Sequence, residues 1–145
     1  MKLKEECEIK SSGLKLTRHR QEIFQLLKES KQPVTAEQIY AALREKNISI
    51  NLSTVYRILD SLSGSELVSK INIGEDKKNH YEYNCMAHRH YLVCLCCNNI
   101  FSVGDCPLGD YEKQVARQTD FVITGHKLNL YGYCSNCRDK ALQGS

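Results

Sequence analysis

Apolar residues recur every three to four positions in the first half of the chain, which is the spacing of a helix that buries one face. This spacing predicts one helix over residues 17–30. A second helix is expected to start at Thr35, because a threonine followed three positions later by a glutamine matches a capping box. A third is expected to run from a cap at Asn51 or Ser53 to Gly64, which suits a helix C-terminus.

Apolar and polar residues alternate after the third helix, as in a strand with one buried face. Strands are predicted over residues 67–73 and 80–83, and the charged residues 74–79 favour a turn between them. Three helices followed by a hairpin is the order of a winged helix, in which the last helix enters the major groove of DNA and the hairpin contacts its backbone. The pattern therefore predicts a DNA-binding domain in this half of the chain.

The third predicted helix leaves polar side chains off its apolar face, and several of them suit phosphates and base edges. A solvated face without a partner would look the same, but the helix order and the hairpin favour DNA. Basic residues that precede or open the first helix could add phosphate contacts. The candidate DNA-binding residues are Lys15, Arg18, Arg20, Ser53, Thr54, Tyr56 and Arg57.

Short apolar segments continue into the second half of the chain. They predict strands at residues 92–93, 100–101 and 121–123, and a helix over 110–119. The expected fold class is therefore α+β, with an N-terminal winged helix-turn-helix domain over residues 1–84 and a C-terminal α/β domain over residues 85–145.

Composition and charge exclude several classes of protein. The net charge of +3 is too small to identify a partner by itself. No apolar run approaches the ~18 residues of a transmembrane helix, and the start of the chain lacks the apolar stretch of a signal peptide. We therefore expect a cytoplasmic protein with no membrane partner. Motifs of metalloproteases, serine hydrolases and phosphate-binding loops are missing, so we do not expect an enzyme.

Cysteine is the unusual residue of this chain. It has eight cysteines, and only Cys7 precedes residue 85. Two CxxC units have the spacing of a zinc site with four thiolates, and their cysteines are Cys94, Cys97, Cys134 and Cys137. Clustered cysteines without an export signal favour a metal over disulfides, so we expect a structural zinc ion; a redox pair is the alternative.

Histidines suggest a second metal site. His88 and His90 occupy alternate positions, so their imidazoles would face the same side of a strand. His126 lies on a later segment and could complete the cluster. Three imidazoles with an oxygen or sulfur ligand suit zinc, iron, nickel or manganese to differing degrees.

Four segments together resemble the ferric uptake regulator family of metal-sensing repressors, in family order and at near-family spacing. They are residues 13–20, 53–57, 88–97 and 125–134. The resemblance implies a C-terminal dimerisation domain and a homodimer that binds a palindromic operator in double-stranded DNA. It also implies that the four cysteines of the CxxC units hold the family's structural zinc.

The resemblance further implies two sensory positions. The first position, between the domains, uses imidazoles in the family, but here it has Gln32, Arg89 and Tyr91. The peroxide-sensing branch of the family needs this site, so we do not expect this chain to sense peroxide through it. The other uses the positions of His88, His90 and His126 together with an acid on the following helix. Simple counting aligns that acid with Gly109, but a one-residue insertion brings Asp110 there, and we favour Asp110.

The identity of the effector metal depends on a few positions. His90 stands where iron-responsive members often have aspartate, and Cys85 and Cys106 resemble cysteines of zinc-responsive members. We therefore predict a zinc-sensing repressor of zinc uptake genes, with Zn²⁺ as effector. An iron-responsive regulator with Fe²⁺ is the alternative, and a zinc-stabilised thiol redox switch is a third possibility. A possible further metal site would use Cys85, His80, Glu82 and Cys106.

Overall fold

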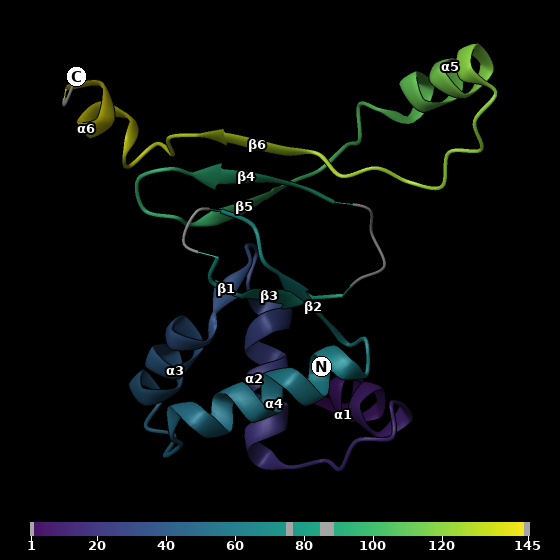
Figure 1. The fold of residues 1–145 in the computed structure, drawn as a ribbon. Helices are drawn as coiled ribbons and strands as arrows, with labels where there is room; N and C mark the ends of the chain where they lie inside the picture. The colour runs from purple at the N-terminus through teal and green to yellow at the C-terminus, as the bar shows by residue number, and fades with distance from the viewer. Residues whose placement is uncertain (1, 75–76, 85–88, 144–145) are drawn as a thin grey trace.

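Two three-stranded sheets organise the chain in this computed structural model, which describes residues 2–74, 77–84 and 89–143. The sheet order is β1-β3-β2 in the N-terminal lobe, residues 2–84, and β5-β4-β6 in the C-terminal lobe, residues 89–143. Figure 1 shows the helices α1–α4 gathered below the first sheet, whereas α5 and α6 lie at opposite ends of the second.

The helices of the N-terminal lobe begin at the residues that the sequence predicts. Thr17 accepts a hydrogen bond from the backbone of Arg20 at the start of α2, Thr35 forms the capping box of α3, and Asn51 rather than Ser53 caps α4. The helix that precedes these three, at residues 2–11, was not predicted from the sequence. The helices are α1 (Lys2–Ser11), α2 (Arg18–Glu29), α3 (Ala36–Glu45) and α4 (Leu52–Gly64).

The predicted hairpin forms the sheet of this lobe. β2 (Val68–Ile71) pairs antiparallel with β3 (His80–Tyr83), so that Val68 lies opposite Tyr83. A short strand that was not predicted, β1 (Val34–Thr35), pairs with the other edge of β3. Three helices and this hairpin give the winged helix, with α1 added in front.

One hydrophobic core holds the N-terminal lobe together. All four apolar residues of the predicted stripe on α4 are buried, namely Val55, Ile58, Leu59 and Leu62. They pack with buried residues of α1, α2, α3 and both strands of the hairpin. Each large side chain that is fully buried contributes roughly 1.5–3 kcal/mol to folding. Because the core lies on one face of α4, the opposite face is left to solvent.

The C-terminal lobe is built around β4 (His90–Cys94). It pairs antiparallel with β5 (Ile100–Val103) and parallel with β6 (Asn129–Gly132). A parallel pair requires a crossover, and the chain makes it through α5 (Gly109–Thr119). The short helix α6 (Arg138–Gln143) follows the second CxxC unit.

The prediction of a strand at residues 121–123 is wrong. Asp120 ends α5 in the left-handed conformation, and the next eight residues form no strand. Both long edges of β4 are already paired, by β5 and β6. Phe121 and Val122 are 70% and 90% exposed, so their apolar character does not reflect burial within one chain.

The predicted boundary between residues 84 and 85 falls at a segment, 85–88, that lies outside the described residues. Among the helices that are described, none combines the length and apolar character needed to cross a membrane.

Candidate metal centres and nucleic-acid interface

The two CxxC units meet at one end of the C-terminal sheet. Cys94 ends β4, and Cys134 follows β6, its parallel neighbour. The four sulfur atoms lie within 4.8 Å of one another, and those of Cys97 and Cys134 are 3.9 Å apart. A tetrahedral zinc ion with Zn–S bonds of about 2.3 Å needs sulfur atoms about 3.8 Å apart. The cluster, completed by Cys137, is therefore consistent with a structural zinc site.

The backbone polarises one thiol of this cluster. Burial raises the pKa of Cys94, but backbone N–H groups of Cys134, Cys97 and Cys96 donate to its sulfur and lower its pKa to about 6. The thiol of Cys137 has a raised pKa, first because it is hydrogen-bonded to Cys134 and then because of burial. Adjacent thiols disfavour several negative charges together, so full deprotonation of the cluster calls for a cation.

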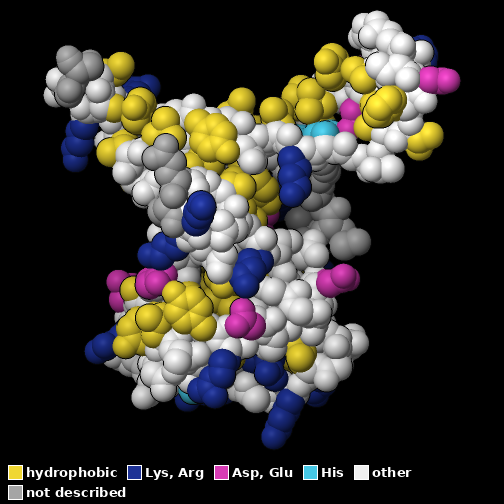
Figure 2. Space-filling view, in the orientation of Figure 1, with side chains coloured by type: hydrophobic (Ala, Val, Ile, Leu, Met, Phe, Trp, Pro, Cys, Tyr) yellow, Lys and Arg dark blue, Asp and Glu magenta, His cyan; other side chains and the backbone are white. Residues whose placement is uncertain are grey.

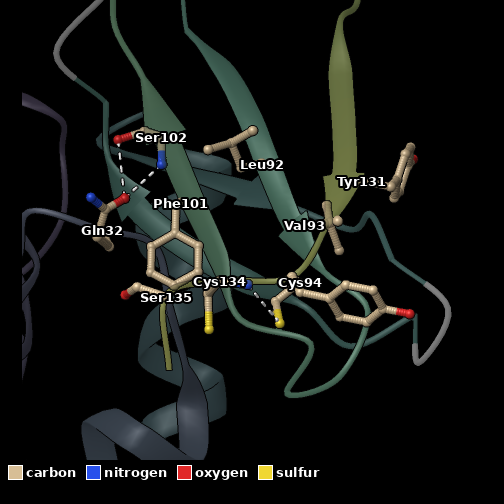
Figure 3. A pocket seen from close by; sticks show the side chains of 11 residues that line it. Gln32, Leu92, Val93, Cys94, Phe101, Ser102, Tyr131, Cys134 and Ser135 are labelled. Atoms are coloured by element: carbon tan, nitrogen blue, oxygen red, sulfur yellow. Dashed lines mark hydrogen bonds between the residues drawn. The ribbon is translucent and has the colours of Figure 1, made fainter. Parts of the chain in front are cut away.

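Figure 3 shows the surroundings of this cluster. Cys94 and Cys134 lie at the bottom of a hollow of about 440 Å³ that is lined by strand residues such as Leu92, Phe101 and Tyr131. On the other side of the hollow, Gln32 of the N-terminal lobe contacts β5. The thiolate cluster therefore lies close to the junction of the lobes.

A second group of metal-binding side chains lies at the other end of β4. His90, Cys106 and His126 each offer one ligand atom, and these atoms lie within 4.8 Å of one another. The Nε2 atom of His126 is 3.2 Å from Nε2 of His90 and 3.2 Å from Sγ of Cys106. The two imidazoles are stacked, with ring centroids 4.9 Å apart. This arrangement joins three segments that are distant in the sequence.

Glu112, rather than the predicted Asp110, faces this group. Its carboxylate contacts Nδ1 of His126, which leaves Nε2 directed at His90 and Cys106. A carboxylate on one ring nitrogen orients the other toward a metal. Residues two positions apart on an α-helix lie about 200° apart around its axis. Asp110 therefore points away from the face that carries Glu112, and it is exposed.

The other predicted metal ligands are placed as follows. Cys106 joins His90 and His126 instead of a separate site with His80 and Glu82. The Nδ1 atom of His80 lies 3.0 Å from the carbonyl oxygen of Lys78, and Glu82 contacts side chains of the C-terminal lobe. Among the described residues, neither joins a group of three or more potential ligands. The remaining two predicted ligands, Cys85 and His88, lie outside the described residues.

The exposed face of α4 carries the predicted DNA-binding residues of this helix. Ser53 and Thr54 donate their hydroxyl groups to the side-chain oxygen of Asn51, at 2.8 and 2.7 Å. Arg57 is exposed, and its guanidinium lies 3.4 Å from the hydroxyl of Thr54. The start of the helix thus presents an ordered polar surface that ends in a cation.

Tyr56 on the same face is tied to α3. Its hydroxyl donates to Glu37 at 2.7 Å, and this bond raises the pKa of Tyr56 to about 12. The basic residues near the start of α2 divide into two kinds. Lys15 and Arg18 are exposed, whereas the guanidinium of Arg20 donates to the carbonyl of Lys15.

Sequence reasoning missed three contacts at these sites. Glu112 could have been found as an acid on the same helix as Asp110, but only the helix orientation distinguishes the two. The grouping of Cys106 with the histidines carried no signal in its spacing. The hydrogen bond from the Ser102 backbone to Gln32, at 2.6 Å, joins residues 70 positions apart and has no local pattern.

A winged helix joined to an α/β domain with clustered thiols and imidazoles defines a metal-responsive DNA-binding regulator. Comparison with known proteins agrees, since the ferric uptake regulator family model matches residues 11–131. The chain belongs to this family, whose members are dimeric, metal-binding transcription repressors and not enzymes.

Individual relatives resemble the chain over almost its whole length. It is 33% identical to a ferric uptake regulation protein of Legionella pneumophila over 137 residues, which cover 94% of this chain and all of that protein. The solved ferric uptake regulator of Vibrio cholerae matches with a TM-score of 0.75 and 31% identity, over 88% of this chain and 97% of the other. That of Helicobacter pylori, described as having three functional metal-binding sites, matches with a TM-score of 0.76 and 25% identity, over 91% and 87%.

Proposed function

We propose that this protein is a zinc-sensing repressor that controls zinc uptake genes by binding a palindromic operator as a homodimer. The observation that supports this most is the thiol of Cys106 beside the imidazoles of His90 and His126. A soft sulfur ligand combined with imidazole favours zinc, whereas iron(II) and manganese sites are richer in carboxylates.

The sensory site in this proposal consists of His90, Cys106 and His126, with His88 as a further ligand implied by the family resemblance. A tetrahedral zinc ion with Zn–N bonds of about 2.0–2.1 Å places its ligand nitrogens about 3.3 Å apart. The observed 3.2 Å between the two Nε2 atoms is close to that value. Glu112 replaces Asp110 as the acid of this site, but it acts by holding His126 in the tautomer that leaves Nε2 free for a metal, whereas Asp110 was expected to be a metal ligand itself.

The cysteine cluster has a separate role in the proposal. Cys94, Cys97, Cys134 and Cys137 hold a structural zinc ion that couples metal binding to folding of the C-terminal lobe. A third site that combines Cys85 with His80 and Glu82 has less support, because Glu82 is already engaged by Arg89.

The operator is read by α4 in this proposal. Arg57 supplies a guanidinium for a guanine edge or a phosphate, with Ser53, Thr54 and Tyr56 beside it. Lys15, Arg18 and Arg20 add contacts to phosphates, which strengthen binding without reading sequence.

Metal binding changes DNA affinity only through a difference in metal affinity between the DNA-binding form and the other forms of the protein. In this proposal, a zinc ion bound at the sensory site would hold β4 to the segments that carry Cys106 and His126. A 100-fold gain in operator affinity corresponds to about 2.7 kcal/mol of coupling. By reciprocity, operator DNA must tighten zinc binding by the same factor.

The decisive experiment is an operator titration at buffered free zinc, run in parallel with ferrous and manganous ions under excess reductant. We expect zinc to increase operator affinity at the lowest free concentration. Equal zinc affinity with and without operator would contradict the proposal. DNA binding that is absent under excess reductant and appears only when the reductant is left out would favour the redox switch.

An iron-responsive regulator is the second candidate, because several relatives with similar sequences are named ferric uptake regulation proteins. A protein that answered to ferrous ion and not to zinc would favour that candidate and leave the sensory site in place.

A further inference from the structure

Successive residues at the start of β4 contact two different sites, and the first of them, Arg89, directly precedes the strand. Side chains alternate between the two faces of a strand. His90 faces His126 and Cys106, whereas its neighbours Arg89 and Tyr91 both contact Glu82 on β3 of the N-terminal lobe. The candidate sensory site and a contact with the winged helix are therefore one residue apart.

Glu82 is the buried partner of both of these contacts. The guanidinium of Arg89 donates to Oε2 at 3.3 Å, and the hydroxyl of Tyr91 donates to Oε1. The residue Glu82 is only 8% exposed, whereas the side chain of Arg89 is 33% exposed. Removing Arg89 therefore leaves the carboxylate of Glu82 mostly buried without its cationic partner, whereas removing Glu82 leaves a guanidinium that water can reach.

Other contacts between the lobes are of another kind. Gln32 accepts hydrogen bonds from the backbone and hydroxyl of Ser102, and Ile71 of β2 packs against Val93 and Ile100, with Tyr91 at the edge of that cluster. These contacts involve no charged group. The pair of Glu82 and Arg89 is therefore a contact between the lobes at which a charge can be removed and tested.

We propose that Glu82, Arg89 and Tyr91 couple the sensory site to the winged helix, so that a change at His90 reaches β3 through its two neighbours in the sequence. This inference rests on the proposed function. Because Arg89 directly precedes β4 and Tyr91 follows His90 on it, a shift or rotation of β4 that brings His90 to its partners also moves Arg89 and Tyr91 relative to Glu82. Glu82 lies between Tyr81 and Tyr83, which are part of or packed against the core of the winged helix, so the shift is passed to the whole N-terminal lobe.

The test uses the full-length dimer and measures operator affinity with and without saturating zinc. Arg89→Met keeps the length of the side chain but removes its charge, and Glu82→Gln removes the other charge. We expect each variant to lose at least tenfold of the zinc-induced gain in operator affinity, while zinc affinity without DNA stays within twofold of wild type. The double variant should lose no more than either single variant, since both remove the same contact.

Arg117→Met on α5 is the control for loss of an arginine charge, because Arg117 is an exposed arginine of the C-terminal lobe that lies outside the contact with Glu82. It should keep the full zinc response. Thermal midpoint and dimer mass identify a variant that fails to fold. In that case Tyr91→Phe, which removes only a hydroxyl group, takes its place. We expect Tyr91→Phe to lose threefold or more of the zinc-induced gain in operator affinity.

The outcomes separate the two proposals. A zinc response that survives intact in Arg89→Met, Glu82→Gln and Tyr91→Phe would overturn the coupling role and leave the sensor in place. Additive losses in the double variant would also overturn it. A wild-type protein without any metal response would overturn the proposed function and the coupling together.

Discussion

The two lobes differ in how they bury apolar surface. In the N-terminal lobe, the described residues form one buried cluster to which every helix contributes. In the C-terminal lobe, only Val93 and Ile100 join a buried apolar cluster, and its third member, Ile71, comes from the other lobe. Neither α5 nor α6 buries a residue.

The C-terminal lobe instead leaves its apolar side chains at the surface. Among the residues whose exposure is described, all the exposed large apolar ones except Tyr56 belong to it, including Leu130 and Tyr131 on β6. Figure 2 shows these side chains spread over the upper lobe and the two arms that project from it. A single C-terminal lobe therefore lacks the core that a stable domain needs. We expect its stability to depend on metal ligation, on the second subunit of the dimer and on its contact with Ile71, whereas the N-terminal lobe folds around its own core.

Loss of a cluster cysteine should have the largest effect. Cys94→Ser or Cys137→Ser removes a ligand from a type of site that supplies ~10–16 kcal/mol of folding free energy in zinc-dependent domains. We expect the C-terminal lobe to unfold and the dimer to dissociate, while the N-terminal lobe keeps its protection against hydrogen exchange. Zinc content and peptide-resolved exchange measure both.

Cys7→Ser is the control for this experiment, because Cys7 is exposed on α1 and outside the cluster. It should change neither zinc content nor dimer mass. If Cys94→Ser unfolded both lobes together, the two would be one cooperative unit and the comparison would fail.

A substitution in the hydrophobic core should destabilise the N-terminal lobe rather than the C-terminal lobe. Leu27 is 1% exposed, so Leu27→Ala should destabilise the N-terminal lobe by about 2–5 kcal/mol through lost contacts and a cavity. Leu130 is 53% exposed in the single chain, so Leu130→Ala should leave that lobe unchanged and act, if at all, on dimerisation. Denaturant unfolding measures the first, and the concentration dependence of dimer mass measures the second. Equal effects on unfolding of the N-terminal lobe would contradict this reasoning.

His126→Ala should separate sensing from folding within the C-terminal lobe. We expect a folded dimer that keeps the zinc of the cysteine cluster but loses the metal-dependent gain in operator affinity, about 2.7 kcal/mol for a 100-fold response. Operator titration at buffered free zinc measures it. A wild-type response in this variant would exclude His126 from the sensory site. His19→Ala in the N-terminal lobe should respond as wild type does.

Arg57→Ala should have the smallest effect of these substitutions, and it should change only the affinity for DNA. If the guanidinium reads a guanine edge, the loss should be roughly 1–3 kcal/mol and concentrated at one base position. If it contacts only phosphate, the loss should be uniform across sequences, with a shallower salt dependence. Metal stoichiometry should stay as in wild type. Unchanged affinity on every sequence would remove this part of α4 from the DNA interface.

The sequence by itself determined three of the four helices and the hairpin of the N-terminal lobe, together with the pairing of the two CxxC units. Helix caps such as Thr17 and Thr35 act on backbone groups within three residues, and the apolar stripe of α4 repeats within a few turns. Such signals are local, so they can be recognised along the chain. The CxxC spacing is local in the same way, because it reflects how two thiolates of one turn reach the same ion.

Only the tertiary structure decided which distant residues meet. The choice of Glu112 over Asp110 depends on the rotation of α5, and the position of β6 after residue 128 depends on which segment returns to the free edge of β4. The side chains of His90 and Tyr91 contact different sites because β4 has one face toward His126 and the other toward Glu82. These contacts join residues up to tens of positions apart. Their partners are selected by the path of the whole chain, and no short pattern around either residue records that path.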